Sequence, residues 1–178
     1  MSGVRKGLAK VEIGLRWDPS PAGGPVHDLD IVAGVYAAAD PYGRPVHLVH
    51  FGSRSPDGTI TLDRDSRTGQ GFGFDEVMTF ELNRMSDESA RVVVGVVIQR
   101  TGDGPAVSFG DVAGPRLRIR EGYTDLAEED FAAVAGASAA TVAEFTRDAS
   151  GVWTLDPAVR GFEADPEEFA RVMGAART

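Results

Sequence analysis

The chain has 178 residues, with 18 Lys and Arg against 27 Asp and Glu, and its formal net charge of −9 argues against a nucleic-acid-binding surface. Hydrophobic residues make up 42% and charged residues 25%, which is typical of one globular domain over residues 1–178 and argues against a disordered chain. The sequence has no cysteine, so disulfides, zinc–thiolate sites, iron–sulfur clusters and a cysteine nucleophile are excluded. We expect a cytoplasmic protein without a signal peptide or membrane span, because the start lacks an apolar segment and no apolar run is long enough.

Alternating apolar and polar residues predict β-strands throughout the first half of the chain. Residues 40–43 and 55–58 carry turn signals, and the second of these turns has Pro56 in the position that a β-turn favours. The strands predicted around them are residues 11–17, 31–35 and 46–51, followed by Ile60 and Leu62.

The second half continues with short strands. Met78, Phe80 and Leu82 alternate with polar residues, and residues 92–98 are apolar on both faces, as in a central strand. Residues 116–120 alternate strictly. Residues 141–147 and 152–155 flank a turn and predict a hairpin. Many short strands with closely spaced turns predict an all-β fold, a two-sheet β-sandwich.

One helix is predicted near the end of the chain. Asp165 can cap its first turn, Pro166 suits the next position, and Glu168 stands three residues after the cap. We expect the helix to close one edge or one end of the sandwich. Its apolar stripe comprises Phe169, Val172, Met173 and Ala176.

Two acidic segments contain the candidate metal ligands. Asp28 and Asp30 stand two apart at the start of a strand, so both carboxylates face one side with their α-carbons roughly 6 to 7 Å apart. Residues 65–76 form a glycine-rich stretch whose carboxylates are Asp65, Asp75 and Glu76. Calcium takes roughly 6 to 8 oxygen ligands, but the spacing is not that of an EF-hand. Because Asp and Gly also dominate turns, the residues by themselves leave both a cation site and plain turns open.

Six segments together resemble one bacterial family. They are Gly14-Leu15-Arg16-Trp17-Asp18, Asp28-Leu29-Asp30, Ser55-Pro56-Asp57-Gly58, residues 65–76, Ser108-Phe109-Gly110-Asp111-Val112 and Arg116-Leu117-Arg118-Ile119. In order and spacing they are similar to the TerD family of tellurium-resistance and chemical-stress proteins, over about residues 8–174. The resemblance implies a β-sandwich, no known enzymatic activity, and calcium binding through the Asp28–Asp30 motif and the acidic glycine loop.

Carried onto this sequence, the resemblance implies one set of ligands. Carboxylate ligands would be Asp28, Asp30, Asp65, Asp75 and Glu76, and backbone carbonyl ligands would be Gly69 and Gly71. The loop departs from the family pattern, because Ser66, Gln70, Phe72 and Phe74 stand at oxygen-bearing positions of typical members. Since ligand charge tunes calcium affinity, these replacements imply at best one calcium site, and a weakened one.

Two further features could hold a partner. Phe72 and Phe74 alternate in the loop and would either dock a partner or fold inward to fill the space of a hydrated ion. Arg116, Arg118 and Arg120 share one strand face and could grip an anion or an acidic partner, or form a solvated face neutralised by the next strand. We expect the acidic stretch 121–130 to be a solvated loop.

The sequence thus favours a non-enzymatic TerD-like stress or tellurium-resistance protein that acts as a calcium-responsive binding module or scaffold, with an unidentified protein partner. The serines and three histidines show no triad spacing. The alternative is a metal-independent docking module that uses Phe72 and Phe74 or the arginine face.

Overall fold

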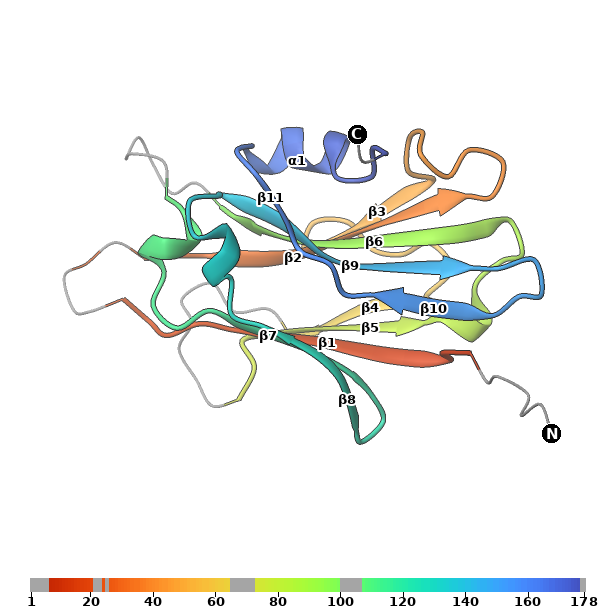
Figure 1. The fold of residues 1–178 in the computed structure, drawn as a ribbon, viewed down its shortest axis with the longest axis horizontal. Helices are drawn as coiled ribbons and strands as arrows, with labels where there is room; N and C mark the ends of the chain where they lie inside the picture. The colour runs from red at the N-terminus through yellow and green to blue at the C-terminus, as the bar shows by residue number, and fades with distance from the viewer. Residues whose placement is uncertain (1–6, 21–23, 25, 65–72, 100–106, 177–178) are drawn as a thin grey trace.

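A computed structural model describes residues 7–20, 24, 26–64, 73–99 and 107–176 of the chain. In this part of the chain two antiparallel sheets pack face to face and one short α-helix lies on the outer side of one of them (Figure 1). The predicted two-sheet β-sandwich is therefore confirmed. No helix in these ranges combines the length and the apolar character that a membrane crossing needs.

The first sheet has the strand order β4-β5-β1-β7-β8. Its strands are β1 (Lys10–Arg16), β4 (Ile60–Arg64), β5 (Glu76–Glu81), β7 (Arg116–Glu121) and β8 (Thr124–Glu129). In this sheet β1 is central, pairing with β5 on one side and β7 on the other.

The second sheet has the strand order β10-β9-β6-β2-β3, and β11 also pairs with β9. Its strands are β2 (Leu29–Ala37), β3 (His47–Val49), β6 (Ser89–Ile98), β9 (Ala139–Arg147), β10 (Trp153–Asp156) and β11 (Arg160–Phe162). The pairing of β9 with β10 confirms the predicted hairpin. Short 3-10 helices at Leu82–Arg84, Phe109–Asp111 and Ala132–Val134 complete the described connections.

The main core lies between the two sheets. Alternate residues of most strands point inward; Val11, Ile13 and Leu15 of β1 are examples, and these three are completely buried. Phe80 of the first sheet and Phe145 of the second meet across this core with ring centroids 5.6 Å apart.

The helix α1 (Pro166–Val172) covers the outer face of the second sheet rather than an edge or an end, which corrects the expectation from the sequence. It buries Phe169, and Met173 just after it, against a second cluster from β2, β6 and β9. This cover explains why residues 92–98 are apolar on both faces. The Asp165 cap is confirmed, since its Oδ1 accepts the Glu168 N–H at 2.8 Å, but Ala176 lies exposed beyond the helix.

Other local predictions need correction. The acidic stretch 121–130 contains β8, an edge strand, rather than a loop; charged side chains on an edge strand discourage pairing with other chains. Leu82 belongs to a 3-10 helix instead of a strand, although it is buried as expected. The predicted third strand is shorter than residues 46–51 and comprises only β3.

Candidate functional site

The end of β1 is fixed to the beginning of β5 by Asp75. The Asp75 N–H donates to the carbonyl of Leu15 at 2.8 Å, and its Oδ2 accepts the N–H of Trp17 at 2.8 Å. Asp75 thereby extends the β1–β5 pairing by both its backbone and its side chain. The residue is only 2% exposed, so this carboxylate lies inside the protein.

Glu76 connects the two sheets. It begins β5 in the first sheet, and its Oε1 accepts the N–H of Ile31 in the second sheet at 2.7 Å. β3 pairs with β2 only from Ala33 to Val35, so the Ile31 N–H lies beyond the end of β3. The carboxylate of Glu76, which is 0% exposed, accepts the hydrogen bond where a neighbouring strand would otherwise do so.

Asp28 and Asp30 stand at the beginning of β2, next to Ile31. Asp30 is 1% exposed and Asp28 is half-buried. The backbone here is held in place, because the Asp28 carbonyl accepts the Gln99 N–H at 2.8 Å and the Trp17 indole donates to the His27 carbonyl at 3.0 Å. The structure therefore places the start of β2, the start of β5 and the end of β1 at one end of the sandwich.

We call Asp28, Asp30, Asp75 and Glu76 the acidic end of the sandwich. A buried carboxylate is costly unless hydrogen bonds or a cation stabilise it, and like charges nearby raise that cost. The group offers only oxygen donors, which suits a hard cation such as calcium rather than a softer metal.

The described residues do not complete a metal site. Over residues 7–20, 24, 26–64, 73–99 and 107–176, no group of three or more Asp, Glu or His side chains could hold an ion. The other predicted ligands, Asp65, Gly69 and Gly71, lie outside the described residues, as does Phe72.

Phe74 lies on the outer face of the first sheet. A Cβ added at Gly14 would be 2.8 Å from two carbons of the Phe74 ring, so the ring packs on the backbone of β1 where a side chain is missing. The Arg118 guanidinium lies over this ring, 4.6 Å from its centroid. Phe74 is thus half-buried between β1 and an arginine.

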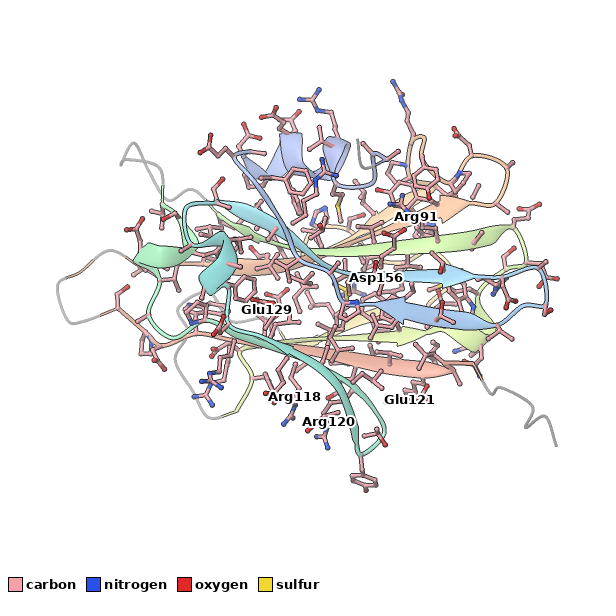
Figure 2. The ribbon with its side chains drawn as sticks, viewed as in Figure 1. Arg91, Arg118, Arg120, Glu121, Glu129 and Asp156 are labelled. Atoms are coloured by element: carbon pink, nitrogen blue, oxygen red, sulfur yellow. The ribbon has the colours of Figure 1, made fainter. Side chains whose placement is uncertain are left out.

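The three predicted arginines of β7 occupy the outer face of the first sheet, because Leu117 and Ile119 between them point into the core. Figure 2 shows Arg118 and Arg120 projecting from this face. Their surroundings differ: Arg120 pairs with Asp125 of β8 at 2.9 Å, as expected of a row neutralised by the next strand. Arg116 and Arg118 instead line a hollow of about 460 Å³.

Arg16 also lines this hollow, and sequence reasoning missed it. Arg16 is the direct register partner of Arg116 across the β1–β7 pairing. Alternation along β1 places Arg16 on the outer face, but only the pairing of β1 with β7 brings it beside the other arginines. The sequence contains no local signal for that pairing.

Comparisons with known proteins agree with this fold. The family model of the TerD domain matches residues 1–172. The tellurium resistance protein TerD of an Alcaligenes species is 28% identical over 134 residues, which are 74% of this chain and 69% of that protein.

Two solved structures are more similar. A homologue of the telluride resistance protein TerD from Streptomyces coelicolor A3(2), SCO6318, has a TM-score of 0.91 and 56% identity, covering 96% of this chain and 100% of that one. A protein described as of unknown function, SAV2460, has a TM-score of 0.93 and 58% identity, covering 97% of this chain and 100% of that one.

Proposed function

The chain belongs to the TerD domain family, and from that membership we propose that it is a non-enzymatic tellurium-resistance and stress protein acting as a calcium-responsive binding module. The observation that carries the proposal is the acidic end of the sandwich. Asp30, Asp75 and Glu76 are each at most 2% exposed there, at the junction of three strands from two sheets. A protein rarely buries such carboxylates without a use for their charge.

The carboxylates of the acidic end would hold the ion, together with oxygens from residues 65–72. Calcium would supply positive charge that neutralises the carboxylates and stabilises their burial. Asp75 already accepts the Trp17 N–H and Glu76 the Ile31 N–H, so a change at Asp75 acts on the end of β1 and a change at Glu76 acts on β2. Ion binding at this place would therefore tighten one end of the sandwich, which is what a responsive module requires.

The structural use of these side chains supports a non-enzymatic role. The bond from the Trp17 N–H to Asp75 joins the end of β1 to the beginning of β5, and the bond from the Ile31 N–H to Glu76 joins the two sheets. The physiological partner would then recognise the surface that the ion orders, and the ion would serve as a structural switch.

The proposal is tested by calorimetric titration of calcium into chelator-stripped protein, with the melting temperature measured alongside. We expect saturable binding in the wild type. At a calcium concentration of 100 times Kd, binding stabilises the fold by about 2.7 kcal/mol, or roughly 5 to 11 °C for a domain of this size. Asp30→Asn and Asp75→Asn should each abolish most of the binding and of the calcium-dependent rise in melting temperature.

Asp40→Asn is the matched control, because Asp40 is an exposed aspartate just beyond the opposite end of β2 from Asp30. It should bind calcium like the wild type. A flat titration of the wild type, with an unchanged melting temperature, would contradict the proposal and favour a metal-independent docking module.

A further inference from the structure

A hollow on the outer face of the first sheet is lined by arginines and is distinct from the acidic end of the sandwich. Its volume is about 460 Å³, within the range of small-molecule sites. Its arginines, Arg16, Arg116 and Arg118, come from β1 and β7 and form what we call the arginine side; Glu128, Glu129 and Asp130 come from β8 and the residue after it and form the acidic side. We call it the arginine pocket; none of the carboxylates of the acidic end lines it, although Phe74, which does, precedes Asp75 in the chain.

The arginine side concentrates positive charge at a cost to the fold. Arg16 and Arg116 are direct partners across the β1–β7 pairing, and Arg118 lies two residues farther along the same face of β7. Like charges directly opposite on a sheet repel each other. The ion pairs within 4.0 Å in the described part of the chain are those of Arg84, Arg91, Arg120 and Arg147, so none of the three pocket arginines forms one there. Arg118 does have a carboxylate as its register partner, since Glu128 lies opposite it across the β7–β8 pairing, whereas Arg16 and Arg116 oppose each other. A bound anion would relieve this repulsion.

Arg118 is held in position before any ligand arrives. Its guanidinium lies over the Phe74 ring, 4.6 Å from the ring centroid, and the ring in turn packs on Gly14. Gly14 is the register partner of Arg118, so its missing side chain makes room for the ring directly beside that arginine. A preorganised planar guanidinium loses less entropy when it binds an oxyanion.

The acidic side limits what the pocket can accept. Glu129 Oε1 accepts the Phe131 N–H at 2.8 Å, and Asp130 Oδ1 accepts the Ala132 N–H at 3.0 Å. These bonds secure the turn at Phe131, whose φ of 65° is the left-handed conformation. The carboxylates are therefore fixed features of the wall, and Glu128 stands exposed beside them. A long polyanion crossing the pocket would meet this wall, whereas a compact anion can remain on the arginine side.

We propose that the arginine pocket binds a small phosphate monoester, whose oxyanion is held by Arg16, Arg116 and Arg118. Arginine presents several N–H donors in a planar fork that matches phosphate oxygens and remains charged at any physiological pH. The volume exceeds that of a bare phosphate ion and leaves room for a small organic group.

The test is calorimetric titration with inorganic phosphate and with glycerol phosphate, in a chelator so that calcium cannot bridge to the anion. We expect saturable binding of both, tighter for glycerol phosphate. Arg116→Gln and Arg16→Gln should each weaken binding by about tenfold or more, since each removes hydrogen bonds between charged groups. Neither variant should lower the melting temperature, because each removes a repulsive pair.

Two control variants separate specific binding from general charge. Arg120→Gln removes the same charge from the same strand face at a residue that pairs with Asp125, and binding should stay within about twofold. Glu128→Gln removes a repulsive wall charge and should tighten binding roughly twofold to fivefold, a gain that misfolding cannot imitate.

Three results would overturn the proposal. The first is a flat titration of the wild type with both probes. The second is an Arg120→Gln variant that weakens binding as much as Arg116→Gln. The third is inorganic polyphosphate binding more tightly than glycerol phosphate, since that would identify an open polyanion surface instead of a pocket for a compact ligand.

Discussion

Asp57 shows how one carboxylate fixes the turn before β4. Its Oδ1 accepts the Ser55 hydroxyl at 2.7 Å, the Thr59 hydroxyl at 2.7 Å and the Thr59 N–H at 3.1 Å. Partial burial acts to raise the pKa of this carboxyl, but the hydrogen bonds from Ser55 and Thr59 outweigh it and lower the pKa from 3.8 to about 2. The ionised carboxylate of Asp57 therefore stabilises the turn more than the protonated carboxyl does.

The lowered pKa predicts a stability difference at acid pH. A carboxyl with a pKa lower in the folded than in the unfolded chain stabilises the fold fully above pH 3.8, and this contribution is lost as pH falls towards 2. Asp57→Asn keeps an acceptor oxygen but not the charge, so at pH 7 it should lower the free energy of unfolding by a few tenths to about 1 kcal/mol, allowing for solvent exposure.

The measurement is denaturant unfolding of wild type and Asp57→Asn from pH 7 to pH 2. Other acidic groups titrate equally in both proteins and cancel in the difference. The difference should shrink between pH 4 and pH 2; a difference that is constant over this interval would show that the charge of Asp57 does not stabilise the turn.

Among the secondary-structure elements, the packing of α1 on the second sheet depends on Gly95 in β6. A Cβ added at Gly95 would lie 2.4 Å from Cζ of Phe169 and 3.0 Å from the carbonyl oxygen of Ala140. The missing side chain lets the Phe169 ring lie close against the sheet, where it also meets Phe162 with ring centroids 5.3 Å apart. Glycine within a strand often marks such a close approach.

We therefore expect Gly95→Ala to displace Phe169 and to lower the free energy of unfolding by about 1 to 3 kcal/mol, as overpacking does. Thermal or denaturant unfolding measures the loss. Gly136→Ala is the control, because a Cβ there would meet nothing within 4 Å, and it should be near neutral. Equal stabilities of the two variants would show that Phe169 does not anchor the helix.

The sequence predicts where strands and helices lie along the chain better than it predicts which elements pack against one another. Alternation and turn residues predicted most strands, and Asp165 predicted the helix start, since these signals are local. The outer face that α1 covers depends on long-range contacts such as those of Arg91 (Figure 2). Arg91 donates to the carbonyls of Pro41 and Gly174 at 2.9 and 2.6 Å and pairs with Glu144 at 2.6 Å.

In the candidate sites, too, local sequence signals identify residues, whereas long-range pairing decides which residues lie together. The acidic motifs identified Asp30, Asp75 and Glu76, although their burial follows from strands that meet only in the fold. Arg16 joins the arginine pocket through pairing with a strand 100 residues away in sequence, as the register of Arg16 with Arg116 shows. The edge strand β8 is not predicted from the sequence, because its acidic residues are depleted in strands and favour a loop assignment.

At the scale of the whole molecule, the two candidate sites meet at adjacent residues. Phe74 packs on the outer face beside the arginine pocket, whereas the Asp75 carboxylate bonds to the Trp17 amide at the acidic end. The two adjacent residues thus belong to the proposed anion pocket and to the proposed calcium site, respectively.

The most direct test of the calcium-responsive account is a crystal structure of the full chain grown with saturating calcium. We expect a calcium ion at the acidic end, with carboxylate oxygens of Asp30, Asp75 or Glu76 at roughly 2.3 to 2.6 Å from it. Clear density for these carboxylates without an ion beside them, or calcium held only by residues elsewhere, would contradict it.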